Sequence, residues 1–483
     1  MMILLKLFLL LLTSTVVADF PAPLDVVDLD LPPRERWVPV YKNALKRHGS
    51  WEYTGAPVFE FLNNFGTPEE WQQRNKTFVD IGMKVIGEEA VLESAGLADF
   101  VNTPDINANI TLGALVFLQM FYELAMECTG VLAQTSHGTL HGRNMDIGLE
   151  VHNITSQVTW IKNGTKLFTS TQFLGYNGVH TGMRLRSKAG EGWSVQANER
   201  VTLVPGPYVG YKAASALMTV TSFALGATPV GQYLRQALTE HSTFNTAIPY
   251  LETEHLASPM YIILGGADNG QGMVLTRDRK GISRSNQFGG IIQQQFQGDK
   301  GPSWHFSEIN NTTAPQLKYQ SRCQTNWDPW VVETDAECLI NMSNYPTWKT
   351  KLCDTMLSIG YNDSTCTDLC RLYSDGRKEG GTADLKWRLA AGKEADVDMI
   401  HSIMSNKTSR VLNGDTKITS VMNSRTEYYS TIVRQWNSEE EAAVKEQRRK
   451  DRDDLIQAGQ IMVNAMLNWK DVTLLGKASL ATT

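Results

Sequence analysis

The sequence lacks an excess of positive charge and, beyond its first residues, lacks any long apolar run. Its 483 residues include 45 Lys and Arg against 51 Asp and Glu, a net charge of −6. This balance gives no reason to expect nucleic acid as a partner. No later segment holds the roughly 20 consecutive apolar residues of a membrane-spanning helix. We therefore expect a soluble mature protein, of one large domain or two to three average ones.

The N-terminus is the exception to this pattern. Lys6 is followed by an apolar run over 7–12, and Val16, Val17 and Ala18 form a small-residue cleavage pattern. The run is too short to cross a bilayer, so a signal peptide over 1–18 is favoured over the alternative, a membrane anchor.

Sequons for N-glycosylation support export, because nine of them follow this leader. Asn310 and Asn311 overlap, so we expect at most one of the two to carry a glycan. The candidates are Asn75, Asn109, Asn153, Asn163, Asn310, Asn311, Asn341, Asn362 and Asn406.

Cysteine is scarce and unevenly placed. Of six cysteines, Cys128 is the only one in the first 322 residues. In an oxidising compartment we expect two local disulfides among Cys338, Cys353, Cys366 and Cys370, with the pairing open; zinc is the less favoured alternative, since no histidine lies among them. Cys128 and Cys323 remain, either bonded to each other or with Cys128 acting as a nucleophile.

The predicted secondary structure changes near Cys128, from mainly helices before it to mainly strands after it. Residues 35–127 have apolar residues at three- and four-residue spacing, which predicts helices. From Cys128 onward, short alternating segments predict strands, beginning with a hairpin in which TSHG is the turn. A helical pair is expected over 208–255, a helix over 394–411, a strand over 417–435 and a long, solvated, charged helix over 438–469. Together these predict an α+β fold.

The predicted hairpin carries two charged residues on the strand that pairs with the Cys128 strand. Its returning strand, HGRNMD, carries Arg143 and Asp146. These are three residues apart, so in a regular strand their side chains point to opposite faces. Both side chains can serve one site only if the backbone bends between them. Gly142 and Asn144 allow such a bend, because these residue types tolerate unusual backbone conformations.

These motifs closely resemble acid ceramidase and N-acylethanolamine acid amidase, N-terminal nucleophile hydrolases related to bile-salt hydrolases. The resemblance rests on FYELAMECTG and HGRNMDIG, and on RWVPVYKNA, FLGYNGVHTGMR, WSVQANERV, YIILGGADNGQGMVLTRDR and CQTNWDPW, which occur in the same order. The resemblance implies an αββα sandwich fold and a precursor chain that cleaves its own backbone after Glu127. The small subunit would be 19–127, mainly helical, and the large catalytic subunit 128–483.

The resemblance also implies roles for individual residues. Cys128 matches the cysteine that becomes the new N-terminus and serves as nucleophile, with its own α-amine as base. No metal or cofactor is implied. The polar residues implied around the nucleophile are Arg143, Asp146, Glu199 and Asn326, the last as the oxyanion donor.

The chain departs from the family pattern in three places. The family's second arginine is missing after Trp330; we assign it to Arg377 in SDGRKEGG, beyond an inserted cysteine-rich segment over 331–373. Residues 19–127 contain no cysteine, which excludes a disulfide between subunits. The charged tail over about 437–483 has no counterpart and is expected to be surface or disordered.

The residues on either side of Cys128, FYEL and HGRNMD, resemble those of ceramidases more, which favours ceramide over N-acylethanolamine as the substrate. A conjugated bile acid and a β-lactam are further alternatives. We expect a heterodimer of the two cleaved subunits, lysosomal or secreted, helped by a saposin-like activator or an anionic lipid surface. The alternative from another class is a catalytically silent, lipid-binding glycoprotein.

Overall fold

The structure is a computed structural model, and it describes most of the chain except the leader, residues 331–373 and some shorter stretches. The described residues are 19–124, 126–147, 151–200, 208–279, 303–305, 321–324, 377–389, 394–408, 411–413, 416–435, 438–470 and 472–473.

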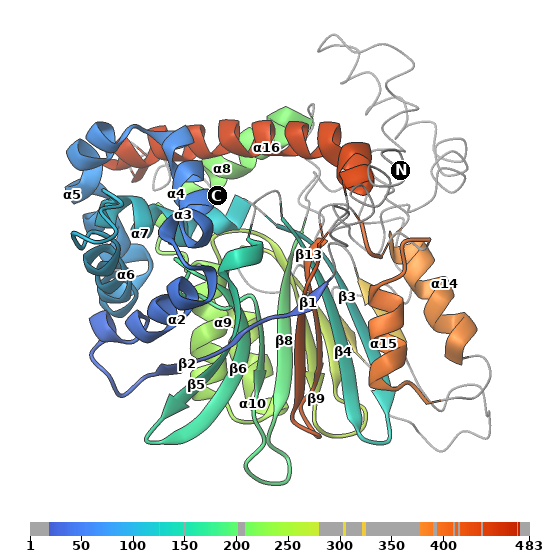
Figure 1. Cartoon of the computed structure of the whole chain (residues 1–483). Helices are drawn as coiled ribbons and strands as arrows, with labels where there is room; N and C mark the ends of the chain where they lie inside the picture. Colours follow the sequence, from blue (N-terminus) through green and yellow to red (C-terminus); the bar gives the residue numbers. More distant parts are fainter. Residues whose placement is uncertain are drawn as a thin grey trace, which may run out of the picture.

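Two β-sheets form the centre of the molecule (Figure 1). The six-stranded sheet runs β1 (Phe20–Pro21), β14 (Tyr428–Val433), β13 (Thr416–Asn423), β4 (Gly138–Ile147), β3 (Met126–Thr135) and β12 (Ser321–Gln324). The eight-stranded sheet runs β11 (Ser303–His305), β10 (Gly272–Arg277), β9 (Met260–Gly266), β8 (Trp193–Glu199), β7 (Thr181–Arg184), β6 (Thr165–Phe173), β5 (Thr155–Lys162) and β2 (Leu24–Asp28). Strand β2 pairs with β5 in parallel, and the other described neighbours pair antiparallel.

The two sheets pack face to face and helices cover their outer faces. Strands β3 and β4 contact β8 and β9 across the interface, where Leu132 packs against Tyr261 and Ile263. Helices α14 (Arg377–Leu389) and α15 (Val397–Met404) lie on the six-stranded sheet, and α9 (Val230–Glu240) and α10 (Phe244–Thr253) on the eight-stranded sheet. The predicted α+β class is confirmed, and the layers follow the order helix, sheet, sheet, helix.

The region before the predicted cleavage point is mainly helical from Pro33 to Leu124. Thr67 caps α5 by accepting a hydrogen bond from the Glu70 N–H while the Glu70 side chain accepts from the Thr67 N–H, a reciprocal pair that starts the helix. Whether this region becomes a separate subunit stays a prediction. Its elements are η1 (Pro33–Glu35), α2 (Val38–His48), α3 (Trp51–Thr54), α4 (Ala56–Leu62), η2 (Asn63–Phe65), α5 (Pro68–Val85), α6 (Gly87–Val101), α7 (Leu112–Phe121) and η3 (Tyr122–Leu124).

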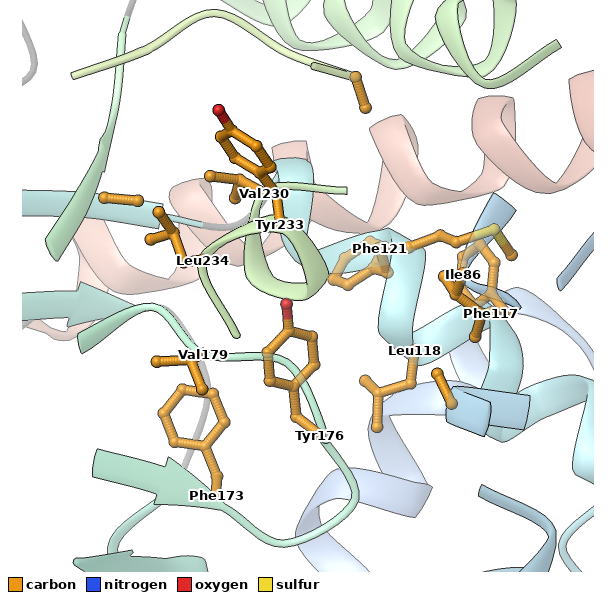
Figure 2. Packing of buried hydrophobic residues seen from close by; sticks show 14 of the residues in the cluster. Ile86, Phe117, Leu118, Phe121, Phe173, Tyr176, Val179, Val230, Tyr233 and Leu234 are labelled. Atoms are coloured by element: carbon orange, nitrogen blue, oxygen red, sulfur yellow. The ribbon is translucent and has the colours of Figure 1, made fainter. Parts of the chain in front are cut away.

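One large apolar core joins this helical region to the sheets. Figure 2 shows Leu118 and Phe121 of α7 gathered with Tyr176 and Val179, and with Val230 at the start of α9. All five side chains are at least nine-tenths buried. Segments on both sides of the predicted cleavage point therefore share one core. No helix among the described residues has the length and apolarity needed to cross a membrane.

Several predicted elements need correction. The region 208–255 contains three helices rather than two, α8 (Tyr208–Ala224), α9 and α10, because Thr243 caps a new helix by accepting from the Thr246 N–H. The single strand predicted over 417–435 is the hairpin β13–β14, whose turn has Glu427 at φ 56°. The helix expected over 394–411 spans only Val397–Met404.

The charged helix near the C-terminus exists as α16 (Ser438–Leu467), but it is not simply a solvated surface helix. Its second half buries Leu455, Ala458, Met462 and Met466 and packs along α8 (Figure 1). This apolar stripe has the spacing of one helix face, so the second half of the helix belongs to the core of the molecule.

Candidate active site

Cys128 lies near the start of β3, at the interface between the sheets. The strand pairs with β4 in unbroken antiparallel register, with Cys128 opposite Met145, and the cysteine has no exposed surface. Strand β3 begins at Met126, so it crosses the Glu127–Cys128 peptide bond. The geometry is therefore that of the uncut chain, in which the Cys128 nitrogen is a peptide nitrogen.

Arg143 is the charged group beside the thiol. Its Nη2 donates to Cys128 Sγ at 3.0 Å, and its Nη1 donates to the His180 carbonyl and the Thr181 hydroxyl, which fix the guanidinium in place. Burial raises the pKa of the Cys128 thiol above its ordinary value, and the positive charge of Arg143 acts in the opposite direction. A thiolate at this site would depend on that arginine.

Asp146 lies on the same strand as Arg143, and its side chain is on the other face of the sheet. Because the β3–β4 ladder is regular, its carboxylate points away from Arg143, as the three-residue spacing predicts. A hydrogen bond from the Asp146 backbone N–H lowers the pKa of the Cys128 thiol, whereas the negative charge of the Asp146 carboxylate raises it and is the larger of these two effects.

The Asp146 carboxylate is held in a buried polar cluster that contains Arg377. It accepts hydrogen bonds from Arg377 Nη1 at 2.5 Å, Asn413 Nδ2 at 2.9 Å and the Thr416 hydroxyl at 2.6 Å. Arg377, at the start of α14, is 4% exposed. The structure thus brings Arg377 to Asp146, directly behind the strand that carries Arg143.

Strand β8 contributes polar side chains from the opposing sheet. Asn198 Nδ2 donates to the Cys128 carbonyl at 3.3 Å, and Glu199, the predicted carboxylate, is the next residue and is buried. Asn198 also accepts from Gln196, whose amide oxygen bonds to His141. Burial lowers the pKa of His141 to about 3, so this chain of side chains is neutral in mild acid. Asn198 was not among the predicted site residues, although it stands beside Glu199 in NER.

Cys323 is not joined to Cys128. On β12 it pairs with Val131 and packs with Leu385 of α14 in the cluster behind the sheet. Cys128 points to the opposite face, which rules out the bond between them that the cysteine count left open. The predicted Asn326, the disulfide candidates at Cys338, Cys353, Cys366 and Cys370, and the sequons at Asn310, Asn311, Asn341 and Asn362 lie outside the described residues.

Across the described ranges no cluster of three or more His, Cys, Asp or Glu residues could hold a metal ion. Of the remaining sequons, Asn109, Asn153 and Asn163 have exposed side chains, and Asn75 and Asn406 are partly buried.

Comparison with known proteins identifies relatives over a little more than half of the chain. The chain is 30% identical to an N-acylethanolamine-hydrolyzing acid amidase of Caenorhabditis elegans over 295 residues, covering 58% of this chain and 74% of the relative. It is 28% identical to the Rattus norvegicus enzyme of that name over 54% of this chain and 65% of the relative. It is also 28% identical to the acid ceramidase of Mus musculus over 54% of this chain and 64% of the relative.

The match therefore spans slightly less than two thirds of the rat and mouse relatives' length. Among solved structures, an N-acylethanolamine-hydrolyzing acid amidase ortholog of Caenorhabditis elegans aligns with 64% of this chain and all of its own, at a TM-score of 0.40 and 22% identity. No protein-family model matches the chain.

Proposed function

Because the chain belongs to the family of acid ceramidases and N-acylethanolamine-hydrolyzing acid amidases, we propose that it hydrolyses the fatty acyl amide bond of ceramide. The products would be sphingosine and a free fatty acid. Cys128 is the proposed nucleophile of an N-terminal nucleophile hydrolase fold. The observation that carries this assignment is the buried Cys128 Sγ with the Arg143 guanidinium 3.0 Å away.

The proposed first reaction is self-cleavage. The Cys128 thiol attacks the Glu127 carbonyl carbon, a C–S bond forms, the C–N bond breaks, and the thiol proton passes to the departing Cys128 nitrogen. Water then hydrolyses the thioester, which leaves a carboxylate on Glu127 and a free thiol and α-amine on Cys128. Nucleophile and base are then on one residue, so no separate histidine is needed.

The same site would then act on the lipid amide. An ordinary thiol has a pKa of about 8.5 and an α-amine about 7.7–8.0, so both are protonated in mild acid unless the site intervenes. Arg143 stabilises the thiolate, and the cluster around Asp146, with Arg377, fixes the strand that presents Arg143. Asn326 is the proposed oxyanion donor, a contribution of roughly 3 kcal/mol in other enzymes. Glu199 is proposed as the carboxylate that the family has beside the active site.

N-acylethanolamine is the second candidate substrate. One relative, of which the chain covers 74%, is an N-acylethanolamine-hydrolyzing acid amidase, whereas the sequences FYEL and HGRNMD resemble those of ceramidases more and favour ceramide. Both substrates present a fatty acyl amide to the same catalytic group. Residues around Cys128 therefore do not separate them.

The setting of the enzyme is part of the proposal. The predicted signal peptide, exposed sequon asparagines and relatives named as acid enzymes support a lysosomal or secreted glycoprotein. The active form would be a heterodimer of residues 19–127 and 128–483. A saposin-like activator or an anionic lipid surface would present the lipid.

The test uses the full-length chain and its Cys128→Ala variant. The wild type is expected to split into two polypeptides with Cys128 as a new N-terminus, and then to hydrolyse ceramide faster than N-acylethanolamine at pH 4.5 in paired assays that are repeated at pH 7. Cys128→Ala is expected to stay whole and inactive. A wild-type chain that stays whole and hydrolyses neither amide would refute the proposal and favour the catalytically silent alternative.

A further inference from the structure

Four side-chain hydroxyls meet between the two sheets, beside the strand that carries Arg143. Thr171 of β6 is at the centre, with its Oγ1 2.7 Å from the Thr431 hydroxyl and 3.0 Å from the Ser420 hydroxyl. The Tyr429 hydroxyl is 2.9 Å from the same oxygen. Ser420 pairs with Arg143 in the β13–β4 ladder, and paired residues of neighbouring strands point to the same face, so these hydroxyls border the arginine. We call Thr171, Ser420, Tyr429 and Thr431 the hydroxyl cluster.

The hydrogen bonds of the hydroxyl cluster run in one direction, toward β7. Tyr429 donates its single hydroxyl proton to the Thr181 carbonyl oxygen at 3.3 Å, because a carbonyl can only accept. The Tyr429 oxygen therefore accepts from Thr171, which uses the only proton of that hydroxyl. Thr171 in turn accepts from Ser420 and Thr431, so its one proton and two lone pairs are all used. The cluster thus holds the main chain at Thr181.

Thr181 links the hydroxyl cluster to the proposed nucleophile. Its hydroxyl accepts from Arg143 Nη1, while Arg143 Nη2 donates to Cys128 Sγ at 3.0 Å. The guanidinium is a rigid plane, so fixing Nη1 also fixes the direction of Nη2. Thr181 and Arg143 are each only 1% exposed. The direction in which the arginine points at the thiol therefore depends on where Thr181 holds its hydroxyl.

We propose that Thr181 is a positioning residue for both reactions of Cys128, and that the hydroxyl cluster holds it in place for that task. This inference deepens the proposed function and rests on it. Burial raises the pKa of Tyr429, although the charge of Arg143 acts in the opposite direction. The phenol therefore stays neutral, as the aliphatic hydroxyls do, and the support of Arg143 does not depend on the pH of the assay.

The experiment compares Thr181→Val with Thr181→Ser in the full-length chain. Valine keeps the shape of threonine and removes the acceptor for Arg143 Nη1, whereas serine keeps the hydroxyl. The His180 carbonyl still accepts from Nη1 in both variants, so we expect a partial loss. Thr181→Val should lower the rate of self-cleavage and the kcat for ceramide or N-acylethanolamine by about tenfold, with KM within about twofold. Thr181→Ser should stay within about threefold of wild type.

Three further variants distinguish positioning from general stability. Thr139→Val is the matched control, because Thr139 is a buried residue of the same strand as Arg143 and donates its hydroxyl to the Gln271 carbonyl at 2.7 Å. It should leave kcat unchanged. If Thr181 acts through Arg143, adding Thr181→Val to Arg143→Met should cause no further loss of rate. Tyr429→Phe removes the donor to the Thr181 carbonyl and should lower kcat by about threefold.

The outcomes separate the inference from the function on which it rests. A Thr181→Val chain that cleaves itself and turns over as Thr139→Val does would overturn the inference while the proposed function stands. Equal losses in Thr181→Val and Thr181→Ser, or a further tenfold loss on top of Arg143→Met, would do the same. If Thr181→Val fails to fold, Tyr429→Phe decides, and a wild-type kcat rejects the role of the cluster. A wild-type chain that stays whole and hydrolyses neither amide refutes the proposed function itself.

Discussion

Replacing Glu93 with glutamine should destabilise the protein strongly, because this carboxylate neutralises two buried arginines. Glu93 is 1% exposed; it accepts two hydrogen bonds at 2.6 Å from Arg235, one at 3.0 Å from Arg36 and one at 3.1 Å from Trp37. Removing one partner from a buried ion pair costs about 3–5 kcal/mol. Glu89 remains near both arginines but is largely exposed, so we expect a loss of about 3 kcal/mol, the lower end.

The assay is urea unfolding in a Cys128→Ala background, where the chain is expected to stay whole and one free energy of unfolding can be measured. The control is Asp80→Asn. Asp80 pairs with Lys76 at 2.6 Å, but their side chains are 58% and 85% exposed, so its loss should cost less than about 1 kcal/mol. If Glu93→Gln costs no more than Asp80→Asn, the reasoning about buried charge in this protein is wrong.

Three other changes test the site and its support. Arg143→Met should slow self-cleavage and amide hydrolysis by on the order of 100-fold, as loss of a preorganised charge does elsewhere, with an unchanged circular dichroism spectrum. Asp146→Asn leaves the buried Arg377 without its carboxylate and should lower the free energy of unfolding by about 3 kcal/mol as well as the cleavage rate; a fully stable variant would contradict this. Gly96→Ala places a Cβ 1.9 Å from the Arg34 carbonyl oxygen and should lower the unfolding temperature, with a cost of about 1–3 kcal/mol.

The centre of the site was predictable from the sequence because its main contact is local. A hairpin with a short turn fixes which residues of its two strands face each other, so Arg143 falls near Cys128 once the hairpin is recognised. The same periodicity put Asp146 on the opposite face. Its use of the backbone N–H has no sequence signal, since every residue other than proline has that group.

The partners contributed from distant parts of the chain were not predictable. Thr416 and Asn413 meet Asp146 from 270 and 267 residues away, and Asn198 reaches Cys128 across the interface between the sheets. Such contacts depend on how the sheets stack, which local periodicity does not encode. The burial of α16 was missed for a related reason, because the many charges in the first half of its sequence obscure the apolar residues of its second half, Leu455 among them.

The first strands of the chain lie at the outer edge of each sheet. Among the described strands, β1 pairs with β14 alone at one end of the six-stranded sheet, and β2 pairs with β5 alone at one end of the eight-stranded sheet. Without the first 127 residues, β14 and β5 would each present unpaired backbone N–H and C=O groups, which are templates for aggregation. If the chain is cut before Cys128, the first fragment would therefore have to stay bound to keep one edge of each sheet covered.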